Sequence, residues 1–149
     1  MKVEVNWKQG LSFTGHADSG YELPLGASPS VGGENDGFRP LELMAISLAG
    51  CTAMDVISIL VKKRQEIEEF TVEVQTTQSS DHPKVFTHIV ILYHIQGRNV
   101  EETAVRRAIE LSATNYCPAQ AMLGKVIPID FVYEILCNGK TISGNLELI

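Results

Sequence analysis

Two of the three cysteines lie in surroundings that suit thiol chemistry, and Cys51 is the more informative. It lies in the segment 48–55, where alanine or glycine at positions 49, 50 and 53 leaves little side-chain bulk around its sulfur. Gly50 costs about 1 kcal/mol of helix propensity relative to alanine, which suggests that another backbone or a substrate must come close there. The alternative for this segment alone is a buried cysteine that acts as a small hydrophobic residue.

A polar stripe includes this cysteine. Four side chains follow steps of four and three residues and so share one face of a predicted helix that is otherwise apolar: Ser47, Cys51, Asp55 and Ser58. Such a stripe would place a carboxylate and two hydroxyl groups along the same face as the thiol.

Cys117 directly precedes Pro118, so it is a natural N-cap residue of a short helix. The partial positive charge of a helix start favours the thiolate and predicts a lowered pKa for this thiol. An inert cap residue is the alternative. The segment 116–119 is no Cys-x-x-Cys motif, so any partner thiol must come from elsewhere in the chain. Cys137, next to the turn signal Asn138-Gly139, is interpreted as an incidental strand residue.

The histidines give little support for a metal site. His88 and His94 lie on the same face of one predicted strand but about 20 Å apart, so they cannot share an ion. No Cys-x-x-Cys or His-x-x-x-His spacing accompanies any of the four histidines. We therefore expect no metal and no cofactor.

Composition excludes several classes of protein. The chain has 149 residues with 44% apolar residues, and its 12 Lys and Arg against 18 Asp and Glu give a net charge of −6. These values argue against nucleic-acid binding and against disorder. The richest apolar stretch is interrupted by polar residues, which argues against a membrane span. The first residues show no signal peptide, and three cysteines favour a reducing compartment, so we expect a cytoplasmic protein.

The elements that must position the cysteines follow from the pattern of apolar residues. Short strands are expected over 3–7, 11–16 and 21–25, then an exposed loop over 26–37 and a long helix from Pro40 to about Arg64. Strands over 70–78 and 85–96 precede a second helix, which the pair Asn99 and Glu102 would cap and which would run to about residue 115. One or two helical turns over 119–125, a strand over 129–135 and a returning arm over 141–149 complete the chain.

This order predicts an α+β fold with a mainly antiparallel sheet and two helices packed on one face of it. No linker separates two domains, so residues 1–149 are expected to form one domain, with a hairpin extension over 138–149.

With these residues in place, the chain resembles the OsmC/Ohr family of thiol-dependent peroxidases, most closely its YhfA-like branch. The resemblance covers nearly the whole chain to about residue 136. It is carried by Arg39-Pro40-Leu41-Glu42-Leu43, by Ala49-Gly50-Cys51-Thr52-Ala53-Met54-Asp55 and by Tyr116-Cys117-Pro118. The segments 57–65 and 85–89 point to the YhfA-like branch.

The resemblance implies an OsmC-like fold and an intertwined homodimer, in which the long helices of both subunits are central and buried. It also implies a catalytic cycle in which Cys51 attacks an organic hydroperoxide and Cys117 resolves the sulfenic acid to a disulfide. An external dithiol would then reduce that disulfide. Met44, Leu48, Met54 and residues near Met122 are expected to line an apolar pocket that favours an oily hydroperoxide.

Two positions depart from the pattern of the peroxidase members. The peroxidase members carry a glutamate directly after the helix-opening proline, where this chain has Leu41. They also carry an arginine in the N-terminal region, where this chain has none before Arg39. Glu42 and Arg39 are the candidate replacements, although on a straight helix Glu42 lies opposite Cys51. The alternatives to an enzyme are therefore a redox-sensing or apolar-ligand-binding dimer, and a structural dimer whose cysteines only pack.

Overall fold

The computed structural model describes residues 1–148, and the chain divides into two compact units, Met1–Met44 and Ala45–Ile149. The long helix α1 (Pro40–Lys62) begins in the first unit and continues through the second. The two units are described separately below. That residues 1–149 form a single domain stays a prediction.

The first unit contains a three-stranded antiparallel sheet of β1 (Val3–Gln9), β2 (Ser12–Ala17) and β3 (Glu22–Leu25), in that order. The predicted turn at Gly10 has φ +51°, a conformation that glycine adopts without strain. All of β1 is exposed, including three large apolar side chains: Val3, Val5 and Trp7. The apolar side chains of this strand therefore find no cover among the described residues.

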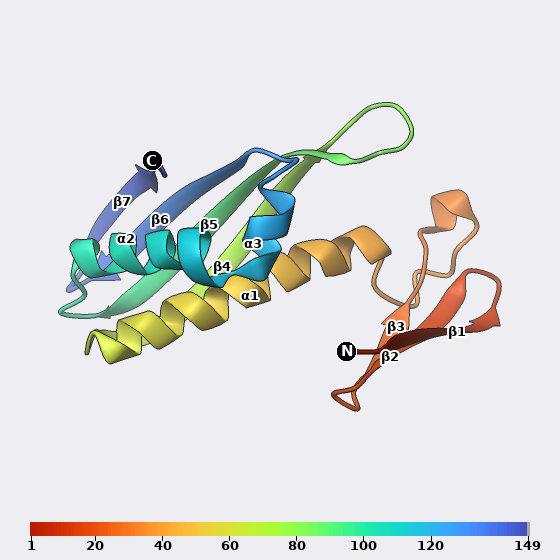
Figure 1. The fold of residues 1–149 in the computed structure, drawn as a ribbon, viewed down its shortest axis with the longest axis horizontal. Coiled ribbons are helices and arrows are strands. Elements are labelled where there is room, and N and C mark those ends of the chain that lie inside the picture. Colours follow the sequence, from red (N-terminus) through yellow and green to blue (C-terminus); the bar gives the residue numbers. More distant parts are fainter. Residues whose placement is uncertain (149) are drawn as a thin grey trace. The chain divides into compact units, whose positions relative to one another are not determined.

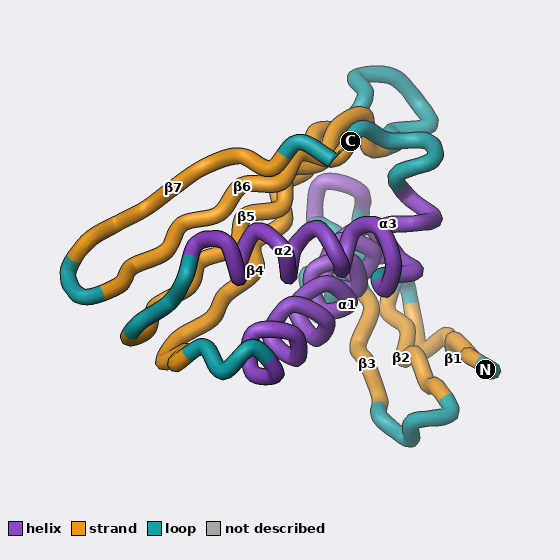
Figure 2. The backbone as a smooth tube through the Cα atoms, turned by 60° about the vertical axis from the view of Figure 1, so that its left-hand side comes forward, coloured by secondary structure: helices purple, strands orange, loops and turns teal. Residues whose placement is uncertain are grey.

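The second unit is built on a sheet with the order β4 (Glu66–Gln78), β5 (Phe86–Arg98), β6 (Ile129–Cys137) and β7 (Lys140–Leu146). Its outer pairs are antiparallel, but the central pair β5–β6 is parallel. A parallel pair needs a crossover connection. α2 (Glu102–Leu111), a π-helical turn (Ser112–Tyr116) and α3 (Pro118–Leu123) supply it, as Figures 1 and 2 show. The predicted α+β, mainly antiparallel fold is confirmed.

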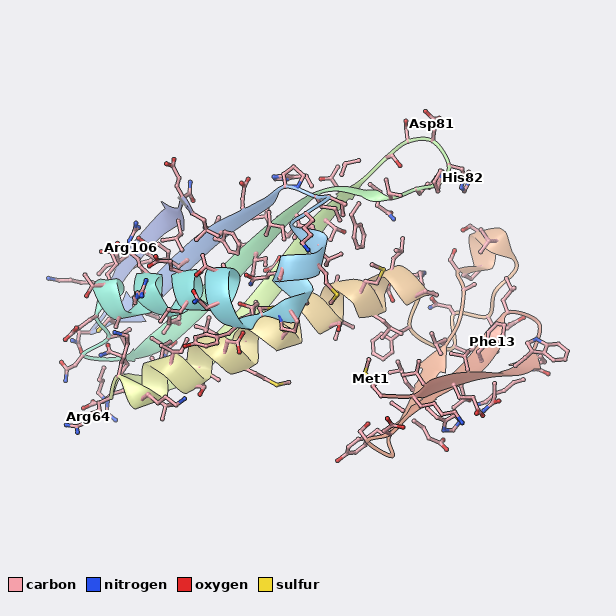
Figure 3. All side chains as sticks on the ribbon, viewed as in Figure 1. Met1, Phe13, Arg64, Asp81, His82 and Arg106 are labelled. Carbon is pink, nitrogen blue, oxygen red and sulfur yellow. The ribbon has the colours of Figure 1, made fainter. Side chains whose placement is uncertain are left out.

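The helices cover one face of this sheet, with α1 and α2 side by side (Figures 1 and 2). α1 follows the predicted bounds closely and buries side chains at steps of four residues: Leu48, Thr52, Val56 and Leu60. The three apolar ones, Leu48, Val56 and Leu60, join alternate residues of β5 and the inner side of α2 in one hydrophobic core. Figure 3 draws the side chains on the ribbon and labels Arg106 on α2. The Nη1 atom of Arg106 donates a hydrogen bond to the Tyr133 hydroxyl at 3.0 Å, which joins α2 to β6.

By length and composition alone, α1 could also cross a membrane, and it is the one such helix among the described residues. The core helix of a water-soluble protein passes the same test. Its four fully buried side chains face the core of the second unit, as expected for a core helix. The absence of a membrane span stays a prediction.

One local prediction at the ends of the elements differs from the structure, and another is confirmed. The N-cap of α2 is Glu101, whereas Asn99 has φ +54° and ends the strand with a turn, so the predicted capping pair of Asn99 with Glu102 is wrong. The Glu102 carboxylate instead accepts a hydrogen bond from the Tyr133 hydroxyl at 2.5 Å. The predicted hairpin at Asn138-Gly139 is confirmed, with φ +51° and +74°. Its returning strand ends at Leu146, and residue 149 lies outside the described residues.

Candidate functional site

The second unit brings the two thiols together. Cys51 lies in the middle of α1 and Cys117 at the start of α3, and their Sγ atoms are 2.8 Å apart. Both cysteines are free, and the Cys117 thiol donates a hydrogen bond to the Cys51 sulfur. A disulfide bond measures about 2.05 Å, so the two sulfurs need to approach by only about 0.8 Å to form one. Both residues are predicted from the sequence as reactive thiols, and the fold brings them together.

The position of Cys117 is fixed by the backbone on both sides of it. The π-helical turn before it brings its N–H to the Ser112 carbonyl oxygen at 2.9 Å. It is the N-cap of α3, and its sulfur accepts a hydrogen bond from the Gln120 N–H at 3.4 Å. The predicted N-cap is therefore confirmed. π-helical turns occur frequently at functional sites.

The predicted acidity of Cys117 is wrong. This side chain is only 2% exposed, and burial, together with its hydrogen bond to Cys51, raises the pKa of the Cys117 thiol to about 12. The N–H groups of Gln120 and Ala119 act in the opposite direction but are outweighed. Removing the thiolate from water costs more than the start of a six-residue helix returns. Cys51, by contrast, is only partly buried.

A carboxylate shares this site. One oxygen of Asp55 and the two sulfurs all lie within 4.8 Å of one another. Asp55 follows Cys51 by one helical turn, as the predicted polar stripe requires. Among the described residues, no hydrogen bond or ion pair joins either thiol to a lysine or arginine.

A buried hydrogen-bond network supports the carboxylate and was missed by sequence analysis. The Thr52 hydroxyl lies 2.7 Å from the Tyr93 hydroxyl and 2.9 Å from that of Ser112. Ser112 donates to Asp55 Oδ2 at 3.1 Å, so the network reaches the thiol site. Burial raises the pKa of Tyr93 and keeps its hydroxyl neutral. The sequence signal was Thr52, a polar residue in the spacing of the buried side chains of α1.

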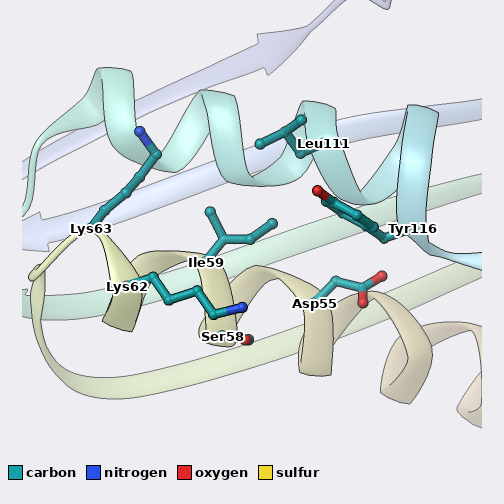
Figure 4. Close-up of a pocket in the computed structure, with 7 residues that line it drawn as sticks. All are labelled: Asp55, Ser58, Ile59, Lys62, Lys63, Leu111 and Tyr116. Carbon is teal, nitrogen blue, oxygen red and sulfur yellow. The ribbon is translucent and has the colours of Figure 1, made fainter.

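Asp55 also lines a cavity of about 290 Å³ (Figure 4). Its other lining residues come from α1 and the residue after it, from the end of α2 and from the π-helical turn: Ser58, Ile59, Lys62, Lys63, Leu111 and Tyr116. This lining differs from the expected apolar one. Leu48 is fully buried in the core, whereas Met54 and Met122 are 72% and 66% exposed. Two lysines and a carboxylate make this cavity suitable for ligands with polar or charged groups.

Arg39 and Glu42 belong to the other unit, Met1–Met44, and bind each other. Arg39 Nη1 lies 2.6 Å from Glu42 Oε1, and the Arg39 backbone N–H donates to Glu42 Oε2 at 3.0 Å. These contacts, the backbone one first, hold the pKa of the Glu42 carboxyl below its usual value. Within its unit this carboxylate stabilises the start of α1, and its predicted role as an activator of Cys51 stays a prediction.

Cys137 lies on β6, where its sulfur accepts a hydrogen bond from the Val100 N–H at 3.4 Å. This contact accounts for the residue structurally and makes it a matched control for experiments on the two other cysteines.

Comparison with known proteins agrees with the resemblance seen in the sequence. The family model described as "OsmC-like protein" matches residues 33–132, which include both thiols of the site. This chain belongs to the OsmC-like family. Protein YhfA of Escherichia coli is 33% identical over 136 residues, which cover 91% of this chain and 98% of that protein.

Solved structures with the same fold extend the comparison. A hypothetical protein from Aquifex aeolicus is 28% identical with a TM-score of 0.81, covering 92% of this chain and 96% of that one. The organic hydroperoxide resistance protein OsmC from Legionella pneumophila has a TM-score of 0.67 at 15% identity, covering 90% and 94% of the two chains. At that identity the similarity shows the shared fold alone. Some proteins that share this fold are thus described as organic hydroperoxide resistance proteins.

Proposed function

We propose that this OsmC-like protein is a thiol-dependent organic hydroperoxide reductase, with Cys51 as the nucleophile and Cys117 as the resolving thiol. The observation that carries the proposal is the 2.8 Å contact between two free thiols that come from different helices of one unit. Two cysteines that only packed in a core would have no need to face each other at this distance.

The proposed cycle has three balanced steps. The Cys51 thiolate attacks the terminal peroxide oxygen, the O–O bond breaks, and a proton completes the alcohol product, which leaves a sulfenic acid on Cys51. The Cys117 thiol then attacks this sulfur and water leaves, with formation of a disulfide. Finally an external dithiol takes over the disulfide by thiol–disulfide exchange and returns both cysteines to the reduced state.

The difference in burial supports the order of the two thiols. Cys51 is partly exposed and accepts the hydrogen bond, whereas Cys117 is 2% exposed and donates it. Its raised pKa keeps Cys117 protonated at neutral pH, which suits a resolving thiol that acts only after Cys51 is oxidised.

The test measures peroxide turnover by the purified, reduced protein with dihydrolipoamide as the reductant. Cumene hydroperoxide and hydrogen peroxide are compared, and three variants are assayed: Cys51→Ser, Cys117→Ser and Cys137→Ser. We expect faster turnover of the organic peroxide. We expect loss of turnover in Cys51→Ser, a single turnover without disulfide in Cys117→Ser, and unchanged rates in Cys137→Ser.

Two other results would favour the alternatives. Slow formation of the Cys51–Cys117 disulfide without turnover would favour a redox-sensing protein. The supporting observation for that alternative is that, within residues 1–148, no hydrogen bond or ion pair joins a lysine or arginine to either thiol. Failure of the two sulfurs to crosslink under any oxidant would leave only a packing role and overturn the proposal.

We also infer that the working form is a cytoplasmic homodimer joined through α1. The side of this helix that faces away from the core is apolar and exposed. On it, Ile46 is 50%, Met54 72% and Val61 62% exposed. These residues share a sector of the helix with Gly50, and a Cβ atom added to Gly50 would meet nothing within 4 Å. A glycine in the middle of an exposed apolar stripe suits the close crossing of a second α1.

A further inference from the structure

The thiol site combines three groups that are ligands for soft and borderline metal ions. The sulfurs of Cys51 and Cys117 and an oxygen of Asp55 lie within 4.8 Å of one another. Thiolate and carboxylate ligands bind Zn²⁺ at about 2.3 Å and about 2.0–2.2 Å, respectively. A tetrahedral ion would hold the two sulfurs about 3.7 Å apart, so they would separate by about 0.9 Å from their present contact.

The electrostatics of the site also favour a cation. All three groups are neutral or negative, and no hydrogen bond or ion pair within residues 1–148 links the sulfurs to a lysine or arginine. A reactive cysteine ordinarily has a positive group beside it. A bound divalent ion would supply that charge and stabilise both thiolates together with the carboxylate.

The surroundings of the carboxylate resemble the outer shell of a metal site. Ser112 donates a hydrogen bond to Asp55 Oδ2 at 3.1 Å, and Thr52 in turn lies 2.9 Å from Ser112. Such contacts fix the orientation of a ligating carboxylate and leave its other oxygen available. Asp55 also lines the cavity of about 290 Å³, so its carboxylate can be reached from that side of α1.

We propose that Cys51, Cys117 and Asp55 form a three-ligand Zn²⁺ site in the reduced protein. Each protonated thiol releases its proton to solvent when its sulfur binds the ion. The search of the sequence for short metal motifs found nothing, because these ligands come from two helices that are far apart in the chain. The site does not depend on the proposed peroxidase activity, since binding requires only the reduced thiols.

Zinc binding and disulfide formation exclude each other at this site. If an organic hydroperoxide reaches the zinc form, two thiolates lose two electrons to form the disulfide. The peroxide takes up those electrons and two protons and becomes an alcohol and water, and the Zn²⁺ ion is released. Oxidation of the two thiols therefore releases the ion.

The test uses the reduced, metal-free full chain without peroxide. Co²⁺ is titrated first, because thiolate-to-cobalt charge-transfer absorption reports binding through sulfur, and Zn²⁺ then displaces it. We expect one ion per chain and loss of the absorption in Cys51→Ser, Cys117→Ser and the oxidised wild type. Asp55→Asn should weaken binding more than Ser112→Ala, for which we expect about a tenfold loss. Cys137→Ser is the matched control and should bind as the wild type does.

Three results would overturn the zinc site: no charge-transfer absorption in the reduced wild type, its persistence in either cysteine variant, or equal binding by the oxidised protein. The oxidised wild type needs no substitution, so the test remains valid if a variant fails to fold. A protein that turns over peroxide but binds no zinc retains the proposed function and loses this inference. A protein that binds zinc through both thiols without turnover gives the reverse result.

Discussion

At the residue scale, Thr52 connects the core to the thiol site. It is fully buried on α1 and shares hydrogen bonds with Tyr93 and Ser112, which in turn contacts Asp55. Thr52→Val keeps the shape of the side chain but leaves two buried hydroxyl groups short of a partner. We expect it to lower the free energy of unfolding by about 1–3 kcal/mol, measured by urea denaturation. Thr52→Ser keeps the hydroxyl group and should lose less; an equal loss would mean that packing of the methyl group dominates.

The Cys117 thiol should make stability depend on alkaline pH. Its pKa is about 12 in the folded protein against an ordinary value of 9.0. Between these values the unfolded chain has lost this proton while the folded chain retains it, so the free energy of unfolding falls as pH rises from about 9 to 12. Below pH 9 both states are protonated and this group contributes no slope.

Urea denaturation of the reduced, metal-free protein across this range checks the expectation. Lysines and tyrosines titrate in the same range, so the informative quantity is the difference between the wild type and Cys117→Ser. We expect the variant to show a shallower alkaline loss of stability, and Cys137→Ser to follow the wild type. Parallel curves for the wild type and Cys117→Ser would contradict the raised pKa.

The two thiols of the site could be predicted from the sequence, but their hydrogen-bond partners and their burial could not. Cys51 and Cys117 were selected because small residues surround one and a proline follows the other, and both signals are local. The partners Tyr93 and Ser112 could not be predicted, since their roles arise from contacts between α1, β5 and the π-helical turn. The acidity of Cys117 was misjudged for the same reason, because burial is a property of the folded unit.

At the scale of elements, α1 presents three different faces. Two of them are apolar, which explains why most of its sequence is apolar. One face is buried at Leu48 and Val56, a polar stripe contains Cys51 and Asp55, and an apolar face remains exposed at Met54. The bounds of such a helix are predictable because Pro40 opens it and basic residues end it. Which apolar face meets the sheet is not predictable from periodicity, since both faces have the same spacing.

The sheet shows the same division between local and non-local signals. The β6–β7 hairpin follows from Asn138-Gly139, whose backbone conformations a type I′ turn requires. The parallel β5–β6 pair has no such local signal, because it depends on how the α2–α3 connection crosses the sheet. Sequence analysis therefore predicted the strands and the hairpin but not the pairing at the centre of the sheet.

Gly97 should be essential to this sheet. A Cβ atom at this position would clash with the backbone carbonyl oxygen of Glu66 on β4, and it would also come close to the Val100 side chain. Since Glu66 cannot shift without disturbing the pairing of β4 and β5, Gly97→Ala should destabilise the protein by about 1–3 kcal/mol. Thermal unfolding is the measurement.

At the scale of the whole molecule, two apolar surfaces lack cover among residues 1–148. They are the side chains Val3, Val5 and Trp7 of β1 in the first unit and the stripe of Ile46, Met54 and Val61 on α1 in the second. A first unit of only 44 residues has little core of its own, so surfaces of this kind favour association with a second copy. Each of the two surfaces, taken by itself, supports the proposed dimer.

Gly50 allows the dimer to be tested without disturbing the fold of one chain. The space around it is open in the single chain, so Gly50→Leu should leave a monomer folded and should favour the helix. If a second α1 crosses at this glycine, the added side chain keeps the helices apart and shifts the protein toward monomer. Sedimentation velocity of the wild type, Gly50→Ala and Gly50→Leu measures this shift, with circular dichroism to confirm that helix content is retained. A wild type that sediments as a monomer, or a Gly50→Leu variant that remains as dimeric as the wild type, would contradict an interface at this position, because a leucine fits there only where no partner helix is close.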